Sequence, residues 1–250
     1  MSDSAAPPQA AVETHELSKS FGAIQALCGL DLRLPAGESV AVFGPNGAGK
    51  TTLIRILTLA LRPTAGSFRI AGLEPSRHER DIRASIGVIS HHSYLYDDLT
   101  ARQNLEFFAR LYGVAAPRPR AAELLEVVGL ASRADDPVGG FSRGMQQRLS
   151  LARALVHEPS LVFLDEPFTG LDPHGARSLR RTLERLRAER RSIVLVTHNL
   201  GEGLELSDRW LILARGRLLA EGPSASVEPA AFERDYFERL ELSRATRVPA

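Results

Sequence analysis

The sequence predicts an α/β fold built around a parallel sheet, and three observations support this expectation. In the second half of the chain, short apolar segments alternate with longer helical patterns, as they do in parallel α/β sheets. In the first half, a glycine-rich loop separates an apolar segment from a helix with three- and four-residue periodicity. A mainly helical stretch between the two halves, from about residue 98 to 157, indicates a subdomain inserted into the fold.

The predicted elements follow in chain order. Strand-like segments come first, on both sides of a turn at Pro35–Gly37, and the helix after the glycines carries Leu53, Ile56, Leu57 and Leu61 on one face. A hairpin-like pair around Arg215–Gly216 closes the sheet, and a polar helical tail follows Gly222. The strands are expected at 30–34, 38–43, 86–90, 160–165, 192–197, 209–214 and 216–222, and the helices at 101–113, 120–130, 143–156, 173–189 and from 199.

Length, charge and cysteine content exclude several classes of protein. The 250 residues suffice for one large domain, and a formal net charge of +1 gives no bulk reason to expect nucleic acid as a partner. The single cysteine, Cys28, excludes an internal disulfide and is expected to be a buried small residue rather than a reactive thiol. The N-terminus lacks the features of a signal peptide, and no apolar run approaches the ~20 residues that span a bilayer. We therefore expect a cytoplasmic protein that reaches a membrane only through a partner.

The glycine-rich loop has the pattern of a phosphate-binding loop. The segment GPNGAGKTT satisfies G-x-x-x-x-G-K-[ST], and it stands between a predicted strand and a predicted helix. Glycines allow consecutive backbone N–H groups to point at phosphate oxygens, and the positive end of the following helix adds to the attraction. Lys50 is expected to reach the β- and γ-phosphates, and the Thr51 hydroxyl to hold Mg²⁺. The predicted nucleotide-binding residues of the loop are Gly44, Pro45, Asn46, Gly47, Ala48, Gly49, Lys50, Thr51 and Thr52.

Two later strands end in side chains that would use the nucleotide. The strand in LVFLDEP ends at Asp165, which we expect to hold Mg²⁺ through water, and Glu166 follows it as the group that polarises the attacking water. The strand in LVTHN ends beside His198, which is expected to contact the γ-phosphate. Histidines after strands are usually structural, but the order of these motifs favours a catalytic role for His198.

This order of motifs resembles the ATP-binding subunits of ABC transporters over roughly residues 12–222. The deciding stretch is FSRGMQQRLSLARAL at 141–155, which is similar to the family's signature motif and the helix after it. The resemblance implies a P-loop NTPase fold of the ABC type, with an inserted helical subdomain at about 92–157 and a small N-terminal antiparallel β region. Residues 1–11 are then expected to be a disordered lead-in, and 223–250 a helical tail.

The resemblance also implies a mechanism in which two subunits sandwich two ATP molecules. Each ATP would lie between one subunit's phosphate loop and the other subunit's signature, here Ser142, Arg143, Gly144 and Met145. Ser142 is a good N-cap residue, so free N–H groups would point toward the γ-phosphate. Arg143 and Met145 replace the usual glycine and glutamine, and Arg143 either adds charge near the phosphate of the other subunit or faces solvent. Asp172 matches the aspartate that communicates across the dimer, and Phe21 matches the aromatic residue that stacks on adenine, with a core position as the alternative.

His91 stands where the family places a glutamine. By resemblance it would link the γ-phosphate and Mg²⁺ to the helical subdomain that grips the membrane partner. A transition-metal site at His91 and His92 is disfavoured, because adjacent residues of an extended segment point to opposite sides. A pair of surface histidines is the other alternative.

The resemblance implies an ATP hydrolase that drives export through separate permease subunits at the inner face of the membrane. Haem export in cytochrome c maturation is one interpretation, and a compact exporter of drugs, lipids or polysaccharides is the other. A soluble ATPase acting on DNA or the ribosome is less favoured, because the chain shows one set of motifs and no heptads. An ATPase that remodels the cell envelope without moving a solute is a further alternative.

Overall fold

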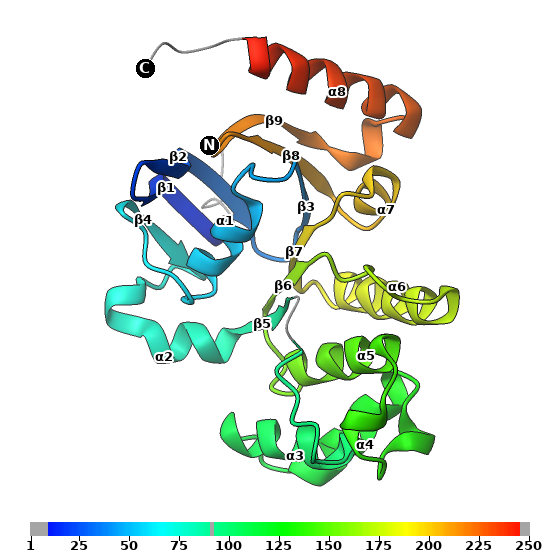
Figure 1. Cartoon of the computed structure of the whole chain (residues 1–250). Helices are drawn as coiled ribbons and strands as arrows, with labels where there is room; N and C mark the ends of the chain where they lie inside the picture. Colours follow the sequence, from blue (N-terminus) through cyan, green and yellow to red (C-terminus); the bar gives the residue numbers. More distant parts are fainter. Residues whose placement is uncertain (1–9, 91–92, 246–250) are drawn as a thin grey trace, which may run out of the picture.

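The computed structural model describes residues 10–90 and 93–245, and its framework is a six-stranded sheet (Figure 1). The strand order is β5-β6-β7-β3-β8-β9, with the first five strands parallel and β9 antiparallel to β8. Every residue of β3, β6 and β7 is buried, as expected for parallel strands that are covered on both faces. The bounds are β3 (Ser39–Phe43), β5 (Ile86–Ile89), β6 (Leu161–Asp165), β7 (Ser192–Val196), β8 (Arg209–Ala214) and β9 (Arg217–Pro223).

The two faces of this sheet contribute to different parts of the core. Along β6, Val162 and Leu164 pack with α6 and with three inserted helices, α3 (Ala101–Leu111), α4 (Pro117–Val127) and α5 (Arg143–Ala154). Leu161 and Phe163 pack with α1 and with a second, smaller sheet. This alternation is the two-residue period of a strand. The helices outside the inserted region are α1 (Lys50–Leu57), α2 (Pro75–Ser85), α6 (Pro173–Ala188), α7 (Leu200–Glu205) and α8 (Pro229–Ala245).

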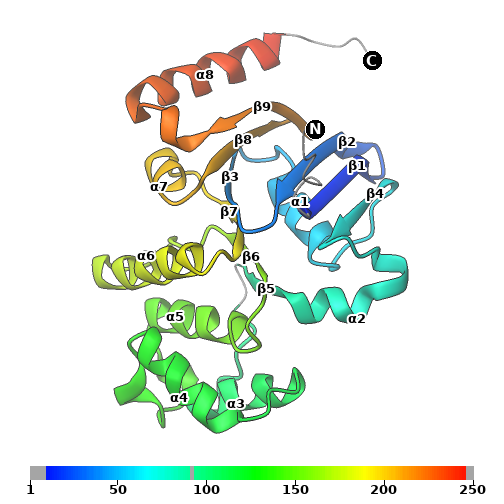
Figure 2. The same ribbon diagram turned by 180° about the vertical axis from the view of Figure 1, so that it is seen from behind.

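A second, antiparallel sheet lies beside α1, with the strand order β2-β1-β4 (Figures 1 and 2). Its strands are β1 (Ala10–Phe21), β2 (Ile24–Pro35) and β4 (Ala65–Ile70). The predicted antiparallel region is confirmed, and β1 begins earlier than expected. Ala10 and Ala11 were assigned to a disordered lead-in, but both are buried in β1, where Ala10 pairs with Pro35.

The inserted helical region lies between β5 and β6, at one end of the molecule in Figure 1. Thr100 and Gln103 form a reciprocal capping box that starts α3, and Ser142 caps α5. The helices α3, α4 and α5 surround an apolar cluster that includes Leu105, Leu124 and Leu149. The helical bounds are α3 (Ala101–Leu111), α4 (Pro117–Val127) and α5 (Arg143–Ala154), and the short 3₁₀ turns of the chain are η1 (Ala131–Arg133), η2 (Val138–Gly140) and η3 (Ser224–Ser226).

One expected helical position was wrong. Leu61 was placed on the apolar face of the helix after the glycines, but α1 ends at Leu57. The Thr58 hydroxyl donates a hydrogen bond back to the carbonyl of Ile54, and Leu59 adopts a left-handed conformation with φ of 62°. A β-branched C-cap residue followed by a left-handed residue stops the helix, although the apolar spacing continues to Leu61.

Candidate functional site

The predicted catalytic side chains meet at one edge of the large sheet. β6, β7 and β3 are parallel neighbours, so their carboxyl ends lie at the same edge. Gly44 follows β3, Asp165 is the last residue of β6, and His198 follows β7 by two residues. Ligands of open α/β sheets bind at this edge, and the strand order therefore brings residues from distant parts of the chain together.

The phosphate loop joins β3 to α1 as predicted. Gly49 is the N-cap of α1 with φ of 104°, and no described side chain caps this helix. The N–H groups of the first helical turn have no partner within the helix, so they are available to an anion. Gly44 has φ of 150°, and a Cβ at this position would lie 2.2 Å from the carbonyl oxygen of Leu213. The loop therefore approaches β8 so closely that only glycine fits.

Lys50 folds back over this loop. Its Nζ donates to the carbonyl oxygens of Gly44 and Pro45, at 2.5 and 3.0 Å. Burial lowers the pKa of Lys50, and the nearby carboxylates of Glu166 and Asp165 act in the opposite direction. An ammonium group beside both the loop and the carboxylates is suited to bind the terminal phosphates of a nucleotide.

Thr51 and Asp165 form the candidate magnesium site. The Thr51 hydroxyl donates to Oδ2 of Asp165 at 3.2 Å, and Asp165 is 3% exposed. A hydroxyl and a carboxylate are hard oxygen ligands, and Mg²⁺ is usually bound by one or two such groups together with phosphate oxygens and water. Among the described residues, no cluster of three or more His, Cys, Asp or Glu side chains could hold a metal. These residues therefore fit a Mg²⁺ ion that arrives with a nucleotide.

Glu166 and His198 form a hydrogen-bonded pair next to this site. Nδ1 of His198 lies 2.7 Å from Oε2 of Glu166, and the Glu166 side chain is much less exposed than the His198 side chain. Glu166 has φ of 52°, and its N–H donates to the Val196 carbonyl at 2.9 Å. An ionised Glu166 accepts the hydrogen bond from Nδ1, which leaves Nε2 of a neutral His198 free to accept another. The pair can thus orient a water molecule, which donates to both acceptors, whereas a contact from His198 to a phosphate oxygen requires a proton on Nε2.

The signature segment is positioned by α5. Oγ of Ser142 accepts from the Met145 N–H at 3.3 Å, and the Met145 side chain packs against the core of the helical region. Arg143 is exposed, and its side chain lies against Gly170. A Cβ atom added to Gly170 would be 2.9 Å from Nε of Arg143. Gly144 faces Leu171, because a Cβ atom added to Gly144 would be 3.8 Å from Cδ2 of Leu171.

The segment after Glu166 contacts the signature within the same chain. The Gln147 side chain donates to the Pro167 carbonyl at 3.1 Å, and Asp172 caps α6 by accepting from the Gly175 N–H at 2.6 Å. In contrast, Figures 1 and 2 place α1 beside the small sheet and α5 beyond α6, so one chain does not bring its phosphate loop to its own signature.

Phe21 ends β1 and is 48% exposed, so its ring is not in the core, and Lys19 Nζ lies 5.2 Å from the ring centroid. His91, for which roles in metal and γ-phosphate contact were expected, lies outside the described residues together with His92.

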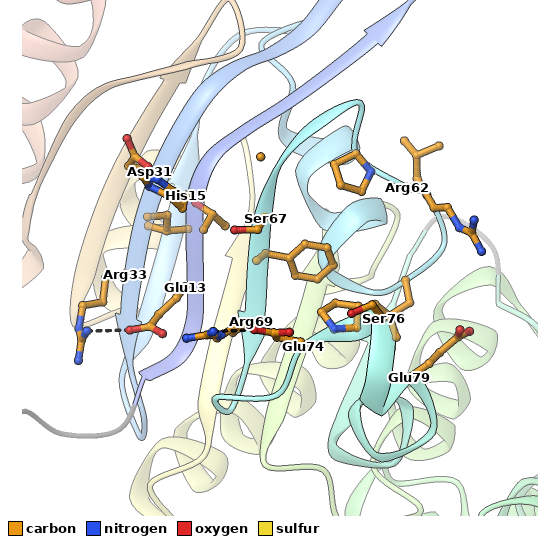
Figure 3. Close-up of a pocket in the computed structure, with 18 of the residues that line it drawn as sticks. Glu13, His15, Asp31, Arg33, Arg62, Ser67, Arg69, Glu74, Ser76 and Glu79 are labelled. Atoms are coloured by element: carbon orange, nitrogen blue, oxygen red, sulfur yellow. Dashed lines mark hydrogen bonds and ion pairs between the residues drawn. The ribbon is translucent and has the colours of Figure 1, made fainter.

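A large cavity of about 1570 Å³ lies elsewhere, along β1, β4 and the start of α2 (Figure 3). Its charged side chains pair with each other, as Arg33 does with Glu13 at 2.7 Å and Arg69 with Glu74 at 2.6 Å. None of the predicted site residues lines this cavity. The phosphate loop, Asp165, Glu166 and His198 lie instead at the edge of the large sheet.

Comparisons with known proteins agree with this geometry. The family model described as ABC transporter matches residues 27–169. A daunorubicin resistance ATP-binding protein of Streptomyces coeruleorubidus is 42% identical over 220 residues, which are 87% of this chain and 70% of that protein. A Nod factor export ATP-binding protein I of Paraburkholderia xenovorans is 41% identical over 223 residues, 88% of this chain and 73% of that protein.

Solved structures give the same result. The ATP-binding subunit of an ABC transporter superposes with a TM-score of 0.81 at 28% identity, covering 93% of this chain and 98% of the other. A dimeric ATP-binding cassette in a post-hydrolysis state, bound to ADP and Pi, superposes with a TM-score of 0.78 at 28% identity. This match covers 85% of this chain and 98% of the other. Among the described helices, none combines the length and apolar character needed to cross a membrane. The chain belongs to the ABC transporter family, as an ATP-binding ATPase domain of the kind that drives transport.

Proposed function

We propose that two copies of this chain sandwich two ATP molecules and drive export through separate membrane permease subunits. The observation that supports this most directly is the Glu166–His198 pair at 2.7 Å, at the sheet edge that carries the phosphate loop. Because each chain keeps its phosphate loop apart from its signature, a complete site needs a second chain. The similar ATP-binding cassette bound to ADP and Pi is named as a dimer, which supports an assembly of two chains.

The residues of the site divide the work of hydrolysis. The N–H groups of the loop and Lys50 bind the phosphates, and Phe21 stacks on the adenine. Thr51 and Asp165 would hold Mg²⁺, which neutralises charge on the phosphates when it is bound. Glu166 accepts a hydrogen bond from the attacking water and polarises it, while His198 contacts the γ-phosphate.

The second chain completes the site. Its Ser142 and the first turn of its α5 donate hydrogen bonds to the γ-phosphate, and Asp172 communicates between the two sites. Arg143 is exposed beside Gly170, so its charge lies at the surface that would face the other chain's nucleotide.

The cargo is proposed to be a drug-like or lipid-like molecule rather than haem. The relatives described above are named for daunorubicin resistance and for Nod factor export. Neither is named for haem export or cytochrome c maturation, and that interpretation stays a prediction without support from these relatives.

The permease is proposed to contact the helical region. α3 and the segment before it expose a group of large apolar side chains, in which the rings of Tyr96 and Phe107 are 5.2 Å apart. Exposed aromatic clusters of this kind usually mark interaction sites. The exposed members of the group are Tyr94, Tyr96, Phe107, Leu111 and Tyr112.

The Glu166→Gln variant tests this function. The amide cannot act as the base, so we expect ATP binding to stay near the wild-type level and hydrolysis to fall by about 10²-fold or more. Glu158→Gln is the matched control, because Glu158 also adopts a left-handed conformation, with φ of 56°, but lies before β6 and away from the site. Phosphate release and equilibrium binding of ATP are measured for the wild type, Glu166→Gln and Glu158→Gln.

Two results would contradict the proposal. Hydrolysis by Glu166→Gln at the wild-type rate would remove the catalytic assignment. When Glu166→Gln is added with ATP to mildly solubilised native membranes, we expect a multi-span membrane protein to co-purify. Recovery of ribosomal or DNA-repair proteins without a membrane protein would instead favour the soluble class of ABC ATPase.

A further inference from the structure

The last turns of α5 hold the backbone on both sides of residues 91 and 92. Oγ of Ser150 donates to the Ser93 carbonyl at 3.3 Å, and Nη2 of Arg153 donates to the Val88 carbonyl at 2.8 Å. Ser150 is 1% exposed and lies one turn before Arg153. The helix that begins at the signature Ser142 therefore ends against the segment that leaves β5.

The environment of Arg153 is unusual for a cation. Its Cζ lies 5.5 Å from the centroid of the Tyr94 ring and 5.4 Å from that of Phe108, and its Nε is enclosed without a hydrogen-bond partner in the described structure. No described carboxylate is close enough to pair with it, and burial lowers its pKa while the tyrosines Tyr112 and Tyr94 raise it. Enclosing a guanidinium is costly, and here one carbonyl and two aromatic faces offset the cost in place of a counter-ion.

Packing alone does not account for an arginine at this place. A methionine or leucine would fill the space between two rings without the desolvation cost. The guanidinium differs from them in contacting three segments at once, namely the end of β5 at Val88, the segment after residue 92 at Tyr94, and α3 at Phe108. The first two of these segments flank residues 91 and 92 in the sequence, between β5 and the helical region.

We propose that Arg153 is a positioning residue, which fixes the segment after β5 and α3 against the helix that carries the signature. This inference rests on the proposed function, because its consequence is for ATP turnover. With Arg153 in place, the signature at the start of α5 and the segment after β5 keep one relative position. Without it, ATP still binds the phosphate loop, but the sites are assembled in the productive arrangement less often.

Arg148 provides a matched control on the same helix. It is also half-buried, its Nη1 donates to the carbonyls of Val128 and Gly129 at 3.0 and 3.1 Å, and its Nε is likewise enclosed without a described partner. Arg148 differs in that it holds the end of α4 rather than the segment after β5. Replacing either arginine thus removes comparable contacts at different places.

The test compares Arg153→Met, Arg153→Lys and Arg148→Met with the wild-type chain. We expect KM for ATP to stay within about twofold in all three variants. Only Arg153→Met should lose about tenfold or more in kcat per folded molecule. Arg153→Lys should recover most of this loss, because an ammonium can still donate to Val88 and lie over an aromatic ring. Hydrogen exchange should be faster across residues 86–96 in Arg153→Met and across 124–130 in Arg148→Met.

Equal kcat losses in Arg153→Met and Arg148→Met, or no loss in Arg153→Met, would overturn the inference. If Arg153→Met does not fold, Arg153→Lys decides the question. A wild-type kcat together with wild-type hydrogen exchange across residues 86–96 supports the role of a cation at this position. A loss of kcat with unchanged hydrogen exchange contradicts it. Failure of the proposed function is distinguishable, because the wild-type chain would then show no hydrolysis that depends on Glu166.

Discussion

At the scale of single residues, His157 shows how burial makes stability depend on pH. Its Nε2 lies 2.9 Å from the Ile86 carbonyl oxygen, its ring stacks on Tyr112 with centroids 3.8 Å apart, and Nδ1 has no described partner. Burial lowers the pKa of His157 below the usual range of a histidine, the hydrogen bond to Ile86 raises it, and the charges of Arg153 and Arg120 lower it further. The folded protein therefore prefers the neutral imidazole.

The sign of the effect on stability follows from this preference. Above a pH of about 6.5 the imidazole is neutral in both states, and its contribution to folding is fully present. As the pH falls from about 6.5 toward the lower pKa of the folded state, the unfolded chain takes up the proton first, and the free energy of unfolding decreases. His157→Phe keeps an aromatic ring against Tyr112 but cannot titrate. Urea unfolding at about pH 7.5 and about pH 5.5 should show a larger decrease for the wild type than for His157→Phe. Equal decreases would contradict this account.

The site residues differ in how far the sequence predicts their positions. Local patterns predict the environments of Lys50, Thr51 and Asp165, because a phosphate loop and an apolar strand that ends in acids each specify a backbone geometry. The contact between Arg143 and Gly170 has no such signal, since it joins two loops through tertiary packing. The same is true of Arg153, whose partners Val88, Tyr94 and Phe108 come from elements distant in sequence.

At the scale of elements, apolar periodicity predicts the fully buried strands and misses two elements with few buried residues. α2 was not expected, because its sequence PSRHERDIRAS buries only Ile82 and shows no apolar face. β4 was missed because only Phe68 and Ile70 of its six residues are buried. In contrast, β3, β6 and β7 are apolar throughout and were predicted, since their burial on both faces requires such residues.

The C-terminal helix α8 packs on the large sheet. Phe232, Tyr236 and Leu240 are buried at four-residue spacing, and the Phe232 ring lies 4.9 Å from Trp210 and 5.5 Å from Phe43. Figure 1 shows α8 lying along β8 and β9. The sequence left open whether this segment packs or regulates, and the contacts establish that it packs.

Phe232 tests the contribution of this helix to stability. Phe232→Ala should lower the free energy of unfolding by about 3–5 kcal/mol, because it leaves a cavity between α8 and the sheet. Phe237→Ala, at a position that is 54% exposed on the same helix, should change it by less than about 1 kcal/mol. The free energy of unfolding of both variants is measured by chemical unfolding, followed by the fluorescence of Trp210, the only tryptophan of the chain. Similar values for the two variants would show that α8 is not docked as described.

At the scale of the whole molecule, the two halves of the ATP site lie in different regions of one chain. The sheet edge carries the phosphate loop, Asp165 and Glu166, while the signature belongs to the inserted helical region (Figures 1 and 2). This separation was expected from the resemblance to ABC ATPases and not from composition or periodicity, which specify single elements. It makes the association of two chains the central claim about function.

The solution mass of Glu166→Gln tests this claim most directly. Light scattering after size exclusion should give the mass of one chain without nucleotide and twice that mass with ATP and Mg²⁺. Adding Ser142→Arg should return the mass to one chain while ATP remains bound, because the larger side chain blocks the signature of each subunit. A mass of one chain for Glu166→Gln at saturating ATP, with ATP binding verified, would contradict the sandwiched site.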